Sequence, residues 1–103
     1  MGMTHRLKTW PSFFEDVWSG DKPFELRKDD RNFALGDCLI LEEWDSPTET
    51  YTGRIILAYV GYILRDAPQF GLDSGYAILG LYGIVRRVDT PEQTVEIHKH
   101  YRF

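Results

Sequence analysis

The sequence predicts a small α+β domain in which a mostly antiparallel β-barrel carries one helix near its N-terminus. Several segments spread along the chain either alternate between apolar and polar residues or form short apolar runs, as strands do. One early segment instead has apolar residues three and four positions apart, which is the spacing of a helix. Glycines interrupt the longest apolar segment, and glycines are common where a sheet curls.

A first strand is expected over residues 5–9. Leu7 lies between two charged neighbours, and such alternation is typical of a strand with one buried face. Pro11 ends this strand, because proline has no backbone amide to donate to a neighbouring strand.

A helix is expected to begin at Ser12. Ser12 to Glu15 match a capping box, in which the serine hydroxyl accepts from the amide three residues on and the glutamate reaches back. The apolar stripe of the helix consists of Phe14, Val17 and Trp18. Gly20 should end the helix, because glycine readily adopts the left-handed conformation found there.

Two further strands are expected in the first half of the chain. Residues 23–28 alternate, with Phe24 and Leu26 on one side and charged residues on the other, which predicts a half-buried strand with a polar face. Gly36 and Asp37 indicate a turn, in which the aspartate bonds nearby backbone amides. The apolar run 38–41 that follows is expected to be a strand covered on both faces.

The second half of the chain predicts two long strands and one edge strand. Residues 51–64 should form one bent strand, with Gly53 and Gly61 at its bends. A loop over residues 66–75 should precede another apolar strand over residues 76–85. The alternating segment 94–100 would add the last strand.

Composition narrows the class of protein. The 103 residues suit one domain, expected to span the whole chain, and a hydrophobic share of 43% suits a folded one. A net charge of −4 argues against a protein that coats long duplexes, although it leaves room for a local basic pocket. The start of the chain is polar and no apolar run is long enough to cross a bilayer, so a cytoplasmic protein without membrane contact is expected.

No metal or cofactor is expected. The lone Cys38 lies in an apolar run and is interpreted as a small buried hydrophobe. His98 and His100 are two positions apart, but no carboxylate stands at ligand spacing beside them. The sequence also has no glycine-rich phosphate loop and no dinucleotide fingerprint.

A charged region follows the predicted helix, and its motifs resemble a known family. The motifs that carry the resemblance are His5-x-Leu7-Lys8, Ser19-Gly20-x-Lys22, Phe24-Glu25-Leu26-Arg27-Lys28-x-Asp30-Arg31-x-Phe33, Gly36-Asp37 and Tyr51-Thr52-Gly53. Together they resemble the DUF3850 family, which is similar to the ASCH domains of the PUA-like superfamily. The resemblance runs from about residue 5 to residue 81 and leaves residues 88–103 as a C-terminal extension.

The resemblance implies a PUA-like β-barrel with a cleft between the barrel and the helical connection. Such domains are associated with RNA or with modified nucleosides, so RNA or a nucleoside is the expected partner. Some small ASCH proteins are amidohydrolases that act on acylated cytidine with a lysine, a threonine three residues later and a distant glutamate. The lysine corresponds to Lys22, but Glu25 occupies the threonine position, and a carboxylate would have to act as a general base on water.

The candidate site follows from these residues. Glu25 and Arg27 share the polar face of one predicted strand, and Lys22 precedes it, so the three side chains are expected to meet in one cleft. Arg27 suits a phosphate, and Glu25 suits the exocyclic amine of a base. The full set of candidate ligand-binding residues is Lys8, Trp10, Lys22, Glu25, Arg27, Lys28, Asp30 and Arg31. Trp10 is the candidate for base stacking.

Three functions remain open on the sequence alone. The first is an RNA- or nucleotide-binding module. The second is an amidohydrolase that acts on acylated cytidine, with Lys22 and Glu25 as catalytic residues. The third is a protein-interaction adaptor, for which the aromatic tail 101–103 is the indication. The charged strand face could also be an ordinary solvated surface with weak ion pairs.

Overall fold

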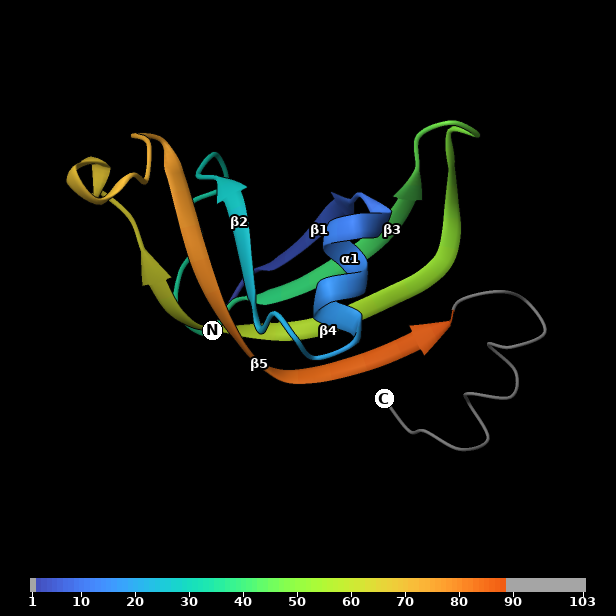
Figure 1. Ribbon diagram of the computed structural model, residues 1–103. Helices are drawn as coiled ribbons and strands as arrows, with labels where there is room; N and C mark the ends of the chain where they lie inside the picture. Colours follow the sequence, from blue (N-terminus) through green and yellow to red (C-terminus); the bar gives the residue numbers. More distant parts are fainter. Residues whose placement is uncertain (1, 89–103) are drawn as a thin grey trace.

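Five strands form one curled sheet in the computed structural model, which describes residues 2–88 (Figure 1). The strands are β1 (Thr4–Thr9), β2 (Phe24–Lys28), β3 (Cys38–Asp45), β4 (Thr50–Leu64) and β5 (Tyr76–Val88). Their order across the sheet is β1-β3-β4-β5-β2, and every neighbouring pair is antiparallel except β1 with β3. The predicted α+β class, with a mostly antiparallel curled sheet and one helix, is confirmed.

The curl of the sheet comes mainly from β4 and β5, which bend strongly (Figure 1). Their register shifts twice, between Leu57 and Tyr59 and between Val60 and Tyr62, and bulges of this kind bend a strand. Gly61 lies at the second shift, where a Cβ atom would be 2.8 Å from Cδ1 of Tyr82. The predicted bent strand is therefore confirmed, and glycine is needed at this position because an aromatic ring covers it.

The two edge strands, β1 and β2, face each other without sharing backbone pairs among residues 2–88, so the sheet is a half-barrel. Two arginine side chains connect the edges instead. Arg27 Nη2 donates to the carbonyl oxygen of Lys8 at 3.0 Å, and Arg31 Nη1 donates to the carbonyl oxygen of Arg6 at 2.9 Å. These guanidinium groups satisfy acceptors that a neighbouring strand would otherwise take.

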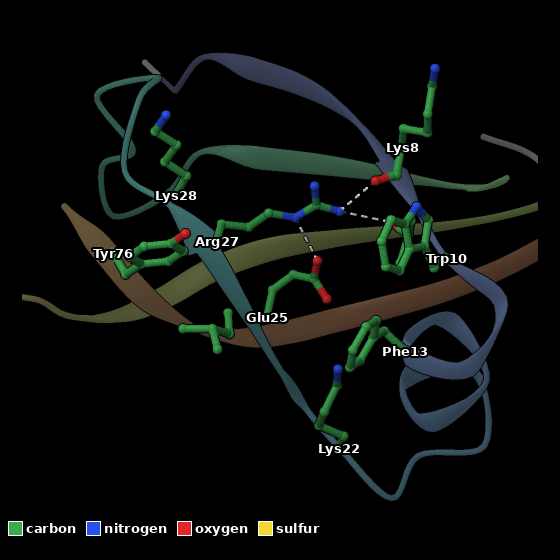
Figure 2. Close-up of a pocket in the computed structure, with 10 residues that line it drawn as sticks. Lys8, Trp10, Phe13, Lys22, Glu25, Arg27, Lys28 and Tyr76 are labelled. Carbon is green, nitrogen blue, oxygen red and sulfur yellow. Dashed lines mark hydrogen bonds and ion pairs between the residues drawn. The ribbon is translucent and has the colours of Figure 1, made fainter. Parts of the chain in front are cut away.

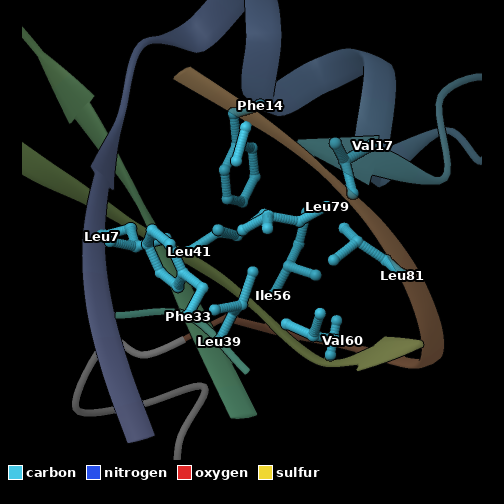
Figure 3. Packing of buried hydrophobic residues seen from close by; sticks show 12 residues of the cluster. Leu7, Phe14, Val17, Phe33, Leu39, Leu41, Ile56, Val60, Leu79 and Leu81 are labelled. Atoms are coloured by element: carbon cyan, nitrogen blue, oxygen red, sulfur yellow. The ribbon is translucent and has the colours of Figure 1, made fainter. Parts of the chain in front are cut away.

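The hydrophobic core lies between the concave face of the sheet and helix α1 (Pro11–Trp18), as Figure 3 shows. Phe14 and Val17 of α1 are completely buried, as their spacing predicts. The sheet contributes Leu7, Leu39, Leu41, Ile56, Val60, Leu79 and Leu81. Because α1 fills the curl, the segments that lead into and out of it lie close to the edge strands.

The predicted capping box is wrong. The helix begins at Pro11 with Trp10 as its N-cap, and no side chain caps it. Ser12 is therefore already inside the first turn, where its hydroxyl cannot take the N-cap role. Proline suits the first helical position because an amide there has no partner in the helix. The predicted end is confirmed, since Gly20 follows the C-cap Ser19 with φ of +91°.

The expectation that residues 38–41 are covered on both faces is also wrong. Leu39 and Leu41 are buried, whereas Cys38 and Ile40 are half-buried. The reason is that the outer face of this curled sheet carries no second layer within residues 2–88, so the strand alternates as antiparallel strands commonly do. Burial still raises the pKa of the Cys38 thiol.

The remaining segments agree with the sequence where the structure describes them. The predicted loop 66–75 contains a short 3-10 helix, Pro68–Phe70, and the strand after it continues to Val88. The predicted strand 94–100, its two histidines and the aromatic tail lie outside the described residues. In the described part, no helix is both long enough and apolar enough to cross a bilayer.

Candidate ligand-binding pocket

A pocket of about 610 Å³ opens between the end of β1, the start of α1 and strand β2 (Figure 2). This volume is within the usual range for small-molecule sites. The residues that line it are Lys8, Thr9, Trp10, Phe13, Lys22, Glu25, Leu26, Arg27, Lys28 and Tyr76. The pocket therefore lies on the open side of the half-barrel, where the two edge strands approach each other.

The floor of the pocket is formed by the polar face of β2, which is the buried face of this strand. Glu25 is only 3% exposed, whereas Leu26 is 54% exposed. A half-buried strand would ordinarily turn Phe24 and Leu26 inward, and here the polar side chains point inward instead. The reason is that the inner face of β2 borders strand β1, whose Lys8 carbonyl and Thr9 hydroxyl bind Arg27. Arg27 in turn pairs with Glu25.

Glu25 and Arg27 form an ion pair at the centre of this floor. Arg27 Nε donates to Glu25 Oε2 at 2.7 Å, and Arg27 Nη2 donates to Thr9 Oγ1 at 2.8 Å as well as to the Lys8 carbonyl. Thr9 is itself buried and donates its hydroxyl to the Leu7 carbonyl at 3.2 Å. These contacts fix the guanidinium group, which in turn fixes the carboxylate.

The other carboxylate oxygen, Glu25 Oε1, is buried and has no hydrogen-bond partner among the described residues. A buried acceptor without a donor costs about 1–3 kcal/mol, and more when it is charged. Native structures rarely leave such a group unsatisfied without a reason. This oxygen belongs to a residue that lines the pocket, so a ligand that supplies an N–H or O–H donor would complete its hydrogen bonding.

Aromatic side chains line the pocket on the α1 side. Trp10 is 60% exposed, and its ring centroid is 6.5 Å from that of Phe13 with the ring planes inclined by 28°. Lys22 Nζ lies 5.2 Å from the centroid of the Phe13 ring. Tyr76, the first residue of β5, lies across the pocket from these side chains (Figure 2).

The lining is cationic in a protein whose net charge is −4. The positively charged side chains are those of Lys22, Arg27 and Lys28, and Glu25 is the acidic residue among the lining. A pocket that has positive charges and apolar walls raises the local concentration of anions. The arrangement therefore suits a ligand that carries a negative charge, a flat ring and a hydrogen-bond donor.

The structure brings together most of the residues that the sequence singled out. Trp10, Lys22, Glu25, Arg27 and Lys28 all line the pocket, and four of them lie on or beside β2. Their close approach follows from alternation on one strand and from the turn that links α1 to it.

Three of the predicted residues are placed differently. The Lys8 ammonium group lies 4.0 Å from the centroid of the Trp44 ring, so this residue borders the pocket while its charge is held elsewhere. Asp30 and Arg31 do not line the pocket. The Arg31 side chain reaches back to the β1 backbone at Arg6.

Sequence reasoning missed four of the lining residues, which are Thr9, Phe13, Leu26 and Tyr76. A signal existed for Phe13, since it is an aromatic residue that falls off the apolar stripe of the helix and therefore must face outward. Tyr76 carried no such signal, because its place depends on the pairing of β2 with β5, in which Lys28 is opposite Tyr76.

Two buried carboxylates outside the pocket stabilise the fold. Burial alone would raise the pKa of Asp37, but hydrogen bonds from His5 and from the Met3 and Ala34 amides outweigh it and lower that pKa. The predicted turn role of Asp37 agrees with these bonds. Hydrogen bonds from Arg54 likewise lower the pKa of Glu43, against the opposing effect of burial.

Comparison with known proteins places this chain in a family and shows its likeness to a phage protein and to a solved structure. The model of the family described as "Domain of unknown function (DUF3850)" matches residues 4–81. An uncharacterized 12.9 kDa protein in the GpA 3′ region of Escherichia phage P2 is 40% identical over 60 residues. That match covers 58% of this chain and 53% of the phage protein, so the chain spans about half the length of this curated relative.

A structural neighbour is an ASCH protein from Zymomonas mobilis, known from a crystal structure. Its fold matches with a TM-score of 0.58, and the match covers 94% of this chain and 80% of that protein. The two sequences are 18% identical, so the likeness establishes the fold alone. The family match and this fold together confirm the resemblance seen in the sequence motifs.

Proposed function

This chain belongs to the DUF3850 family and has an ASCH-like fold, and we propose that its pocket binds a nucleotide, either free or within RNA. The observation that carries this proposal is the buried, unpartnered oxygen of Glu25 at the floor of a cationic, aromatic pocket. A nucleotide has a flat base with N–H donors and an anionic phosphate, so it matches all three features of the pocket.

Glu25 is the residue proposed to recognise the base. Its Oε2 atom is held by Arg27, so the carboxylate is already oriented before a ligand arrives. Its Oε1 atom would accept a hydrogen bond from an exocyclic amine or a ring N–H. Hydrogen bonds to charged groups contribute about 1.5–3 kcal/mol, which corresponds to roughly tenfold or more in affinity.

Arg27 is a positioning residue in this proposal. Its Nε and Nη2 atoms are already engaged by Glu25, Thr9 and the Lys8 carbonyl. The phosphate is instead assigned to the ammonium group of Lys22, which lies beside Phe13 on the α1 side of the pocket. Stacking on the exposed ring of Trp10 would add about 1–3 kcal/mol for one base.

The test is an equilibrium titration of the chain with each ribonucleoside monophosphate and with a short RNA, for the wild type and four variants. Glu25→Gln should weaken binding about tenfold, because an amide oxygen is a weaker acceptor than a carboxylate. Lys22→Ala should weaken binding and reduce the slope of log affinity against log salt by about one. Asp30→Asn and Arg31→Ala are the matched controls outside the pocket, and both should bind as the wild type does.

Two outcomes would overturn the proposal. The first is the absence of binding to any of these ligands by the wild type. The second is equal weakening in the pocket variants and in their matched controls. Release of product from acylated cytidine that stops in Lys22→Ala would instead favour the amidohydrolase, with the free oxygen of Glu25 activating water.

A further inference from the structure

A second hollow lies directly beside the pocket, and Trp10 borders both of them. Its volume is about 400 Å³. The residues that line it are Trp10, Pro11, Ser12, Asp45, Ser46 and Pro47. Trp10 is the residue common to the two linings in the described part of the chain, so it lies between the two spaces.

The backbone of Trp10 is fixed although its side chain is largely exposed. Its carbonyl oxygen accepts from the Phe14 amide at 2.8 Å, which makes it the N-cap of α1. Pro11, the residue after it, restricts the backbone further because its ring locks φ. A large, exposed aromatic ring on a fixed backbone offers a ready surface for stacking.

The chemistry of the second hollow differs from that of the pocket. Among residues 2–88 no Lys or Arg lines it, and Asp45 places a carboxylate there that disfavours phosphate. Asp45 Oδ2 accepts from the Thr48 hydroxyl at 2.5 Å, which orients this carboxylate. The two prolines and Trp10 provide flat apolar surface, while Asp45 and the serine hydroxyls provide hydrogen-bonding groups. A base fits this combination, and a phosphate does not.

We propose that the second hollow binds the neighbouring base of the same RNA strand, so that Trp10 lies between two successive bases. This inference rests on the proposed function, because it assumes that the first pocket holds a nucleotide. It makes a strand of at least two residues, and not a free mononucleotide, the preferred ligand. Single-strand binding proteins commonly place successive bases on aromatic side chains in this way.

The experiment compares three ligands on the wild-type chain by equilibrium titration. They are a nucleoside monophosphate, the nucleoside diphosphate and a dinucleotide that carries a terminal phosphate. The dinucleotide should bind about tenfold or more tightly than the monophosphate, because one more base is stacked. The diphosphate adds charge without a second base, so it should gain much less.

Two variants locate the second base. Ser46→Glu places a bulky, charged side chain in the hollow at an exposed turn, so the fold should be preserved, and the gain from the second base should disappear. Binding of the monophosphate should stay within about twofold of the wild type, since Ser46 does not line the first pocket. Gln69→Glu adds the same charge at a distant exposed position and should retain the full gain.

The outcomes separate the two proposals. No binding of the monophosphate and no binding of the dinucleotide would refute the proposed function itself. Binding of the monophosphate with no gain for the dinucleotide would overturn the second site alone. A gain that persists in Ser46→Glu, or one that the diphosphate reproduces, would also overturn it.

Discussion

Removing Arg27 should destabilise the protein much more than removing its partner Glu25. The Glu25 side chain is 4% exposed and that of Arg27 is 23% exposed, and they are joined at 2.7 Å. Without Arg27, the carboxylate would be left in the floor of the pocket with neither oxygen paired. Without Glu25, the guanidinium group would keep its bonds to Thr9 and to the Lys8 carbonyl, and water could reach it.

The size of this asymmetry follows from the cost of an unpaired buried charge. Breaking a buried pair by removing one partner costs about 3–5 kcal/mol, and the partial exposure of Arg27 places the expected cost near the lower end. We therefore expect Arg27→Ala to lower the free energy of unfolding by about 3 kcal/mol. For Glu25→Ala we expect a loss of about 1 kcal/mol. The double variant should be more stable than Arg27→Ala, because it leaves no buried carboxylate without a partner.

Urea unfolding, followed by circular dichroism and by tryptophan fluorescence, measures these differences. A loss of about 3 kcal/mol corresponds to a shift of roughly 1–3 M in the urea midpoint. The matched variant Arg31→Ala removes an exposed guanidinium group that also bonds the β1 backbone, and it should cost about 1 kcal/mol or less. If the double variant were less stable than Arg27→Ala, an unpaired Glu25 carboxylate would not be the cause of the instability.

Three further predictions concern the sheet and the border of the pocket. Gly61→Ala should cost about 1–2 kcal/mol of unfolding free energy, because its Cβ would be 2.8 Å from the Tyr82 ring, and the cost should vanish when Tyr82 is also replaced by alanine. Glu43 has a pKa below its ordinary value of 4.5, so its contribution to stability is complete above that pH and is lost as the pH falls through the lowered pKa. The urea midpoint should accordingly fall on acidification below about pH 4.5, less steeply in Glu43→Gln, and equal slopes would refute this assignment. Lys8→Met should lower the free energy of unfolding by about 0.5–1 kcal/mol, because it removes the contact of the ammonium group with Trp44. Nucleotide affinity should stay within about twofold, and a large loss of affinity would show that Lys8 contacts the ligand.

The strands and the helix could be read from the sequence because their signals are local. Alternation around Leu7 and the glycines of β4 were enough to place those strands. The start of α1 was misplaced because two local signals compete there, the capping box at Ser12 and the proline before it. Pro11 prevails because its ring and its missing amide fit only the first position of the helix.

The burial of β2 could not be predicted from its own residues. Alternation shows that Glu25 and Leu26 face opposite sides, but only the tertiary structure decides which side is inside. That choice depends on β1, whose backbone carbonyl at Lys8 and buried hydroxyl at Thr9 provide partners for Arg27. The second hollow was equally hidden, because it joins the start of α1 to a turn after β3, more than thirty residues later in the chain.

An NMR titration of the isotope-labelled chain with a ribonucleoside monophosphate tests the nucleotide pocket most directly. The pocket predicts the largest shift changes at the Trp10 indole N–H, at the Glu25 and Arg27 backbone amides and at Arg27 Nε, with little change on the outer face of β4 and β5. The largest changes at Tyr59 and Tyr82 on that outer face, or no saturable change anywhere in the spectrum, would contradict it.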